Sequence, residues 1–332
     1  VSYAAEILVQ PGGALPHNDH FHLRTYCSAL DVQSGCENRG SKKPGYQSFR
    51  GERAETVELA KGLLDEEEPA LRLAAIRRLG LLHERSATDA FIAALDDPDP
   101  RVRAAGGRSL AQLGRGEAAL ARRVAVEKHP QVRAELVWAL GDFDSSDAVT
   151  ALAKLLDEPQ PARFAADFEL DLRVLIADAL AIADDKRPVK PLIELTRSDD
   201  PLVRARAHRA LTLLTNFDPA VTEHDLGATW EKWYAKHGDK SRDEWLVMGF
   251  EARGLEVPRL ALRHVWQLCR GVLDADYLSY NAQRVLMRLS RREPDSLEWS
   301  KKDANFYWRR WFERRCGRLG CPPVPRGMST LD

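Results

Sequence analysis

The chain has 332 residues, of which 30% are charged, and its 49 Lys and Arg residues almost balance its 50 Asp and Glu residues. This length exceeds one small core and predicts two or three structural units. The net charge of −1 argues against binding of the whole protein to nucleic acid, which normally needs a basic face. No apolar run approaches the ~20 residues of a membrane-spanning helix.

The first forty residues do not show the periodicity of a helix. Two short strands are predicted, at residues 7–10 and 20–26. Period-two alternation places His20 and His22 on the same face of the second strand, and His17 lies in the loop that enters it. Three imidazoles within six residues, next to an acid, are a composition typical of a metal site.

The segment His17-Asn18-Asp19-His20-Phe21-His22-Leu23-Arg24, followed by Cys27 and Cys36 around a polar loop, resembles the C-terminal end of penicillin-insensitive murein endopeptidases. These belong to the zinc peptidases that include the D-Ala-D-Ala carboxypeptidases and the hedgehog-type fold. The resemblance implies that His22 binds zinc, that His17 acts as the base or transition-state stabiliser, and that His20 lines the site. The zinc would activate a water molecule to hydrolyse a peptidoglycan crosslink peptide.

The resemblance covers only residues 1–38, and the upstream His and Asp ligands of that family are absent from the chain. We therefore expect the chain alone to be inactive. Because it starts with Val1, we also expect it to begin inside a larger reading frame. The alternative is a chance cluster of histidines on an exposed loop.

The five cysteines suggest two local pairs. Cys27 and Cys36 close one short polar loop, Cys316 and Cys321 close another, and Cys269 is expected to be buried and free. Such pairs favour an oxidising compartment, which here would be the periplasm. The alternative is five reduced thiols in a cytoplasmic protein.

A linker is predicted at residues 39–51, and a repeated turn-helix motif follows over residues 52–216. In each copy a turn is followed by a helix that carries an Arg near its start, and a Leu follows seven residues later on the same helix face. In four of the five copies a Pro lies three residues before the Arg, in the first helical turn, where an Asp before it can cap the helix. The arginines and leucines are Arg72, Arg103, Arg133, Arg173 and Arg204, with Leu79, Leu110, Leu140, Leu180 and Leu211.

One helical hairpin cannot bury its apolar face alone, so the copies are expected to stack into a solenoid. The pattern resembles the HEAT repeat and the related phycobilin-lyase-type repeat. This resemblance implies a mainly α-helical fold, an α-solenoid of HEAT-like hairpins with a short β remnant at the N-terminus. The longer spacing before Arg173 predicts an inserted loop at residues 159–168.

Residues 217–332 are predicted to form a divergent, aromatic-rich helical extension. Residues 207–215 match residues 282–290, and each match is followed by two Trp residues three positions apart. That spacing places both rings on one helix face, where packing into the core is favoured over a sugar- or peptide-stacking surface. The Arg-rich residues 309–326 are compatible with contact to an anionic polymer, although a solvated terminal helix is the simpler interpretation.

Two functions follow from these patterns. The first is the C-terminal part of a zinc-dependent murein endopeptidase fused to a HEAT array that docks a protein partner. The alternative is a non-enzymatic HEAT scaffold that binds a protein partner, cytoplasmic if the peptidase segment is a relic. Nucleic-acid binding through the Arg-rich end is a weaker third hypothesis.

Overall fold

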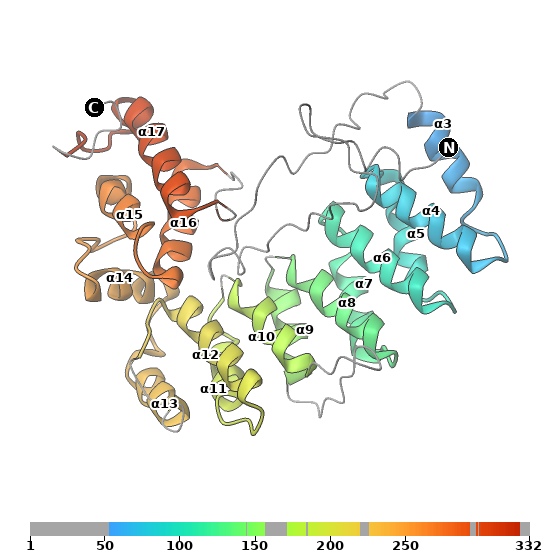
Figure 1. Ribbon diagram of the computed structural model, residues 1–332, viewed down its shortest axis with the longest axis horizontal. Coiled ribbons are helices and arrows are strands. Elements are labelled where there is room, and N and C mark those ends of the chain that lie inside the picture. Colours follow the sequence, from blue (N-terminus) through green and yellow to red (C-terminus); the bar gives the residue numbers. More distant parts are fainter. Residues whose placement is uncertain are drawn as a thin grey trace, which may run out of the picture.

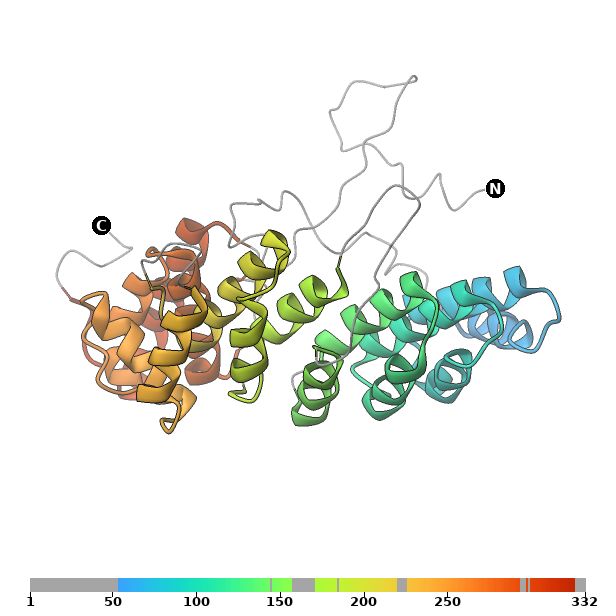
Figure 2. The same cartoon turned by 90° about the horizontal axis from the view of Figure 1, so that it is seen from below.

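The computed structural model describes residues 53–143, 145–156, 171–183, 185–219, 226–292, 297 and 299–325. Within these ranges the chain forms fifteen α-helices and two 3-10 helices, and no strand. The helices follow one another in a single elongated row from α3 to α17 (Figure 1), and the side view in Figure 2 shows the hairpins succeeding one another along the long axis. The predicted strands of residues 1–38, the linker at 39–51 and the insertion at 159–168 lie outside the described residues.

Five helical hairpins form the array. Their first helices are α3 (Arg53–Gly62), α5 (Thr88–Ala94), α7 (Glu117–Val126), α9 (Ser146–Leu156) and α11 (Val189–Leu195). Their second helices are α4 (Pro69–Leu81), α6 (Pro100–Leu113), α8 (Pro130–Gly141), α10 (Leu172–Ala181) and α12 (Pro201–Thr215). The 3-10 helix η2 (Arg85–Ala87) precedes α5.

The chain continues into a second set of helices. These are α13 (Leu226–His237), α14 (Arg242–Ala252), η4 (Leu262–His264), α15 (Val265–Gly271), α16 (Asp276–Ser290) and α17 (Lys301–Leu319). None of the described helices combines the length and the apolarity needed to cross a membrane.

The second helices begin where the repeated motif predicts. The Asp99 carboxylate accepts a hydrogen bond of 2.7 Å from the backbone N–H of Arg101, so it caps α6 directly before its first-turn Pro. In α10 the motif lacks the Pro, and Asp171 still caps the helix through the backbone N–H of Arg173 at 2.8 Å. The cap therefore sets the helix start even where the Pro is missing.

The core of the array is a row of second helices in which α4, α6, α8, α10 and α12 each pack against the next. The five leucines of the motif are completely buried, which confirms the predicted face. Small residues let these helices approach closely: a Cβ added to Gly107 of α6 would lie 2.4 Å from Leu136 Cδ2 of α8. This packing confirms the predicted solenoid of HEAT-like hairpins.

The motif arginines link neighbouring repeats. Arg72 Nε lies 2.8 Å from Asp97 Oδ2 of the next repeat, while its Nη1 donates to the carbonyl oxygens of two loop residues of its own repeat. Arg103 repeats this arrangement one step along, with Nε 2.8 Å from Glu127 Oε2 and Nη1 donating to the carbonyl oxygens of Asp97 and Pro98. These two ion pairs, here called the arginine ladder, link the first three repeats, whereas Arg173 pairs with Asp171 in the cap of its own helix.

The array core extends into the aromatic region. Trp230 and Trp245 pack in the same apolar cluster as the array leucines, and a second cluster that contains Trp308 begins at Leu246. Trp230 and Trp308 are completely buried, which confirms the interpretation of these rings as core residues, whereas Trp311 is half-buried.

A buried amide pair joins the two clusters. Asn281 Nδ2 of α16 donates to the carbonyl oxygen of Leu213 at 2.8 Å and to Asn216 Oδ1 at 3.1 Å. Asn216 Nδ2 in turn donates to the carbonyl oxygen of Leu246 at 2.8 Å. Both amides are buried, so these hydrogen bonds fix α16 against the end of the array.

The structure tests the predictions for three of the five cysteines. Cys316 and Cys321 form a disulfide, and Cys269 is buried and free, as predicted. Burial raises the pKa of the Cys269 thiol, which keeps it protonated and unreactive. Cys27 and Cys36 lie outside the described residues.

Candidate functional site

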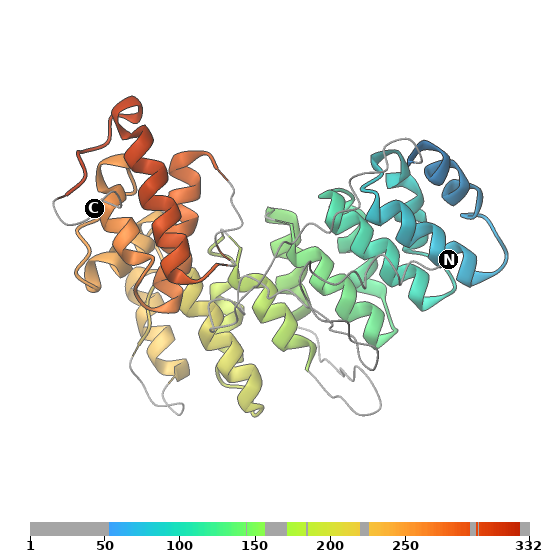
Figure 3. The ribbon, with the colours of Figure 1, turned by 45° about the horizontal axis from the view of Figure 1, so that its top comes forward.

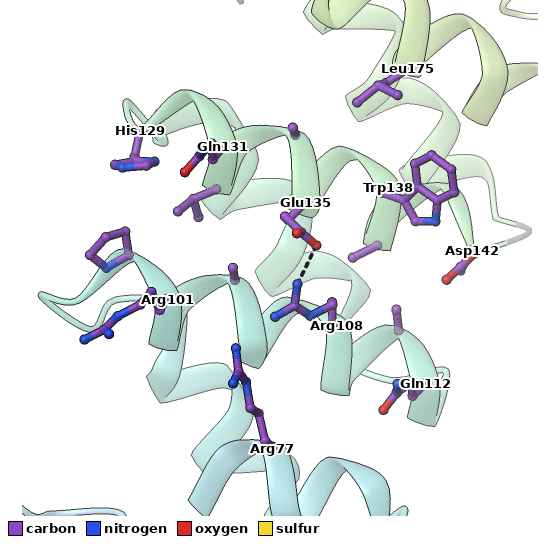
Figure 4. A pocket seen from close by; sticks show the side chains of 16 residues that line it. Arg77, Arg101, Arg108, Gln112, His129, Gln131, Glu135, Trp138, Asp142 and Leu175 are labelled. Atoms are coloured by element: carbon purple, nitrogen blue, oxygen red, sulfur yellow. Dashed lines mark ion pairs between the residues drawn. The ribbon is translucent and has the colours of Figure 1, made fainter. Parts of the chain in front are cut away.

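A groove of about 940 Å³ lies on the exposed face of α4, α6, α8 and α10 (Figure 4). Its floor includes small side chains, which leave room between the helices. Longer polar side chains, together with one indole ring, form its walls. The floor residues include Ala104, Ala111, Ala134 and Ala139.

The helix period explains why one face of α8 builds the middle of this groove. Gln131, Glu135, Trp138 and Asp142 are spaced four, three and four residues apart, so they lie on one face of the helix. The opposite faces of α8 are buried in the array core, for example through Leu136. The four groove residues therefore point away from the core and into the open space between repeats (Figure 4).

Trp138 is the unusual member of this face, because its side chain is 55% exposed. It lies five residues after the motif arginine of its repeat. The same position holds Arg77 in the first repeat and Arg108 in the second. In the first three repeats, this position therefore holds two charged residues and then a large aromatic one.

Inter-repeat ion pairs flank the Trp138 position. Arg108 Nη1 of α6 lies 2.8 Å from Glu135 Oε2 of α8, and Arg206 Nη1 of α12 lies 3.2 Å from Asp178 Oδ2 of α10. The equivalent positions between α8 and α10 hold Trp138 and Leu175, which lie together at the α10 end of the groove (Figure 4). An apolar pair replaces the ion pair at this one step.

The charges of the groove are unevenly distributed. Arg77 forms no ion pair with any described residue, and Arg101 pairs with Asp99 at 2.7 Å, so two guanidinium groups lie at the α4 end. That ion pair helps lower the pKa of Asp99 to about 2. At the other end, the surrounding protein desolvates Asp142 and raises the pKa of its carboxyl, although the side chain keeps contact with solvent.

The described residues that line the groove include no Ser, Thr, Cys, Tyr or Lys side chain. They offer guanidinium groups, two carboxylates, one imidazole and an exposed indole. This set can bind charged and apolar groups of a ligand.

The predicted peptidase residues His17, His20 and His22 lie outside the described residues, so their catalytic and zinc-binding roles stay predictions. Within the described part of the chain, no group of three or more His, Cys, Asp or Glu side chains is placed to hold a metal ion. Sequence reasoning missed Trp138 as a candidate site residue. Alignment of the fifth residue after each motif arginine would have singled it out.

Comparison with known proteins agrees with this fold. Residues 56–122 match the family profile for HEAT repeats. The profile covers the first repeats of the array, and the described residues as a whole form an α-solenoid of HEAT-like hairpins. No curated protein matches the sequence.

Three solved structures are similar to the chain. The complex of CpcE and CpcF of phycocyanin lyase from Nostoc sp. PCC7120 has 18% sequence identity and a TM-score of 0.46, over 82% of this chain and 100% of that chain. One engineered protein has 19% identity and a TM-score of 0.36, over 76% of this chain and 72% of that chain. A second engineered protein has 17% identity and a TM-score of 0.21, over 78% and 88% of the two chains. These similarities are too low to transfer a function.

Proposed function

We propose that this protein is a scaffold that binds a segment of a partner protein in the groove of α4, α6, α8 and α10. The observation that carries the proposal is the 55% exposure of Trp138 at the one inter-repeat step where an apolar pair replaces an ion pair. Exposed aromatic rings set in a groove and surrounded by polar groups are typical binding hot spots, because burying them on association removes apolar surface from water.

The chemistry of the groove defines the partner segment. A large apolar side chain of the segment would pack between Trp138 and Leu175, over a floor of alanines that lets it approach closely. At the other end of the groove, an acidic side chain would face Arg77, which has no ion pair with a described residue, beside the Arg101–Asp99 pair. The segment is therefore acidic where it meets the α4 end of the groove and carries one large apolar anchor residue.

The experiment is a selection from a library of displayed peptides against the full chain. We expect enriched peptides to combine acidic residues with one aromatic or large aliphatic residue. The Trp138→Ala variant should lose these peptides, whereas Val126→Ala should keep them. Val126 is a matched control because it is 62% exposed on α7 of the same hairpin and does not line the groove. Selection of basic peptides, or equal retention by both variants, would contradict the proposal.

A zinc peptidase segment at residues 1–38 is the second candidate function, supported by the sequence motif of His17, His20 and His22. The disulfide between Cys316 and Cys321 supports the periplasmic location that such an enzyme requires. The test is the metal content of the protein isolated from its natural source. One zinc per chain that is lost on His22→Ala would support this candidate, and zinc-free protein would eliminate it.

A further inference from the structure

A second surface lies on α17, the last helix of the structure, at the opposite end of the row from α3 (Figures 1 and 3). Between residues 301 and 319 this helix carries seven Lys and Arg residues and only two acidic ones. The near-neutral charge of the whole chain therefore conceals a strongly basic helix at its C-terminal end.

The arginines of α17 differ from those of the array in their partners. In the array, motif arginines such as Arg72 and Arg103 are held in ion pairs with buried or half-buried carboxylates. On α17, the exposed side chains of four arginines form no ion pair with any described residue. They are Arg310, Arg314, Arg315 and Arg318. Their charge is therefore available to an anionic ligand.

Aromatic rings alternate with these guanidinium groups. Phe306 is 49% exposed, and the Arg310 guanidinium lies over its ring, 5.7 Å from the centroid. One turn further on, the Arg315 guanidinium lies 5.1 Å from the centroid of the half-buried Trp311 ring. These residues line a shallow pocket of about 420 Å³ together with Trp299, Tyr307, Arg314 and one acidic residue, Asp303.

The spacing aligns these groups along the helix. Phe306, Arg310 and Arg314 are each four residues apart, so they form one ridge, and Trp311 and Arg315 form a second ridge beside it. Four residues advance an α-helix by about 6 Å, so each ridge presents a charged or aromatic group at that interval. The result is a strip of alternating aromatic rings and guanidinium groups, formed by Phe306, Arg310, Trp311, Arg314 and Arg315.

We propose that this strip of α17 binds single-stranded nucleic acid. Guanidinium groups bind phosphate oxygens in a bidentate manner, and an exposed ring such as Phe306 can stack on a base that is free of a duplex. A duplex keeps its bases stacked, so the rings would gain no partner there. An acidic peptide would satisfy the arginines but would leave the rings without the flat faces that they can stack on.

The test measures binding of fluorescein-labelled 15-nucleotide single strands to the full chain by fluorescence anisotropy. We expect the double variant Arg310→Glu/Arg314→Glu to weaken binding at least tenfold, and Phe306→Ala to weaken it about fivefold. Arg122→Glu is the matched control, because Arg122 is exposed on α7 and forms no ion pair with a described residue. It should leave the affinity unchanged.

The salt dependence and two competitors distinguish stacking from simple charge attraction. Three or four phosphate contacts predict that log K falls with log salt with a slope of about −2 to −3. A 15-base-pair duplex and poly-glutamate should compete less well than the unlabelled single strand. The proposal is overturned if the single strand does not bind, if the Arg122 variant loses as much affinity as the α17 variant, or if the duplex or poly-glutamate competes equally well.

Discussion

Glu127 offers the sharpest test of how the arginine ladder stabilises the array. Its side chain is 1% exposed and receives Arg103 Nε at 2.8 Å, Arg123 Nη2 at 2.8 Å and the backbone N–H of His129 at 2.8 Å. Substitution by Gln keeps the shape of the side chain but removes the charge that these three donors share. The two guanidinium groups would then face a neutral amide.

The pKa of Glu127 gives the size of its contribution to the stability of the folded state. Burial raises the pKa of the carboxyl, but the hydrogen bonds from Arg103, the His129 amide and Arg123 overcome this effect and lower it from 4.5 to about 2. A shift of this size corresponds to roughly 3 kcal/mol of stabilisation of the folded state. Because the folded pKa is the lower one, this contribution is complete above pH 4.5 and is lost as the pH falls toward 2.

Urea unfolding followed by circular dichroism measures the effect. We expect Glu127→Gln to lower the free energy of unfolding by about 2–4 kcal/mol at pH 7, and the difference from the wild type to shrink as the pH falls toward 3. Glu135→Gln is the control, because Glu135 pairs with Arg108 but its side chain is 42% exposed, and its loss should cost under about 1 kcal/mol. Equal losses for the two variants, or a pH-independent difference, would refute the reasoning.

Three further predictions concern the core, the half-buried imidazole of His208 and the cysteine thiols. Leu140→Ala should cost about 2–5 kcal/mol in urea unfolding, because the side chain is completely buried, and a loss below about 0.5 kcal/mol would place the core on another face. Desolvation lowers the pKa of His208, whose Nδ1 accepts a hydrogen bond from Trp230 Nε1 at 3.1 Å. Because the unfolded chain then binds more protons than the folded chain, the free energy of unfolding decreases as the pH is lowered through 6.5. His208→Gln should therefore lose less stability than the wild type between pH 7.5 and pH 5.5, and equal losses would assign the pH dependence to other groups. Cys316 and Cys321 should resist iodoacetamide until a reductant is added, as peptide mass spectrometry would detect, and labelling without reductant would show that the disulfide is absent from the purified protein.

The fold could be predicted because packing constrains the sequence at regular intervals. The arginine and leucine of each repeat recur every 30 or 31 residues, except for the one longer spacing before Arg173. The leucine is completely buried in all five repeats, so the core requires an apolar residue at that position. The partners of the ladder were not predictable in the same way. Asp97 and Glu127 follow their arginines by 25 and 24 residues, and no local periodicity marks an acidic residue at that distance.

The groove escaped prediction for a different physical reason. Helix α8 is apolar on most of its circumference, so its hydrophobic pattern does not distinguish the exposed Trp138 from the buried Leu136. Exposure there depends on the neighbouring helices α6 and α10, which lie in other repeats. The buried Trp230 and Trp308 were predicted correctly because residues three positions further along carry a second ring on the same face.

The affinity of a selected acidic peptide for the groove tests the central claim most directly. Isothermal titration calorimetry would compare the wild type with Trp138→Ala, Arg77→Glu and the control Val126→Ala. Binding through the groove predicts a loss of about 30-fold for Trp138→Ala, equivalent to about 2 kcal/mol, a smaller loss for Arg77→Glu, and no change for the control. An affinity that is the same for Trp138→Ala and the wild type would contradict a partner-binding role for this face of the array.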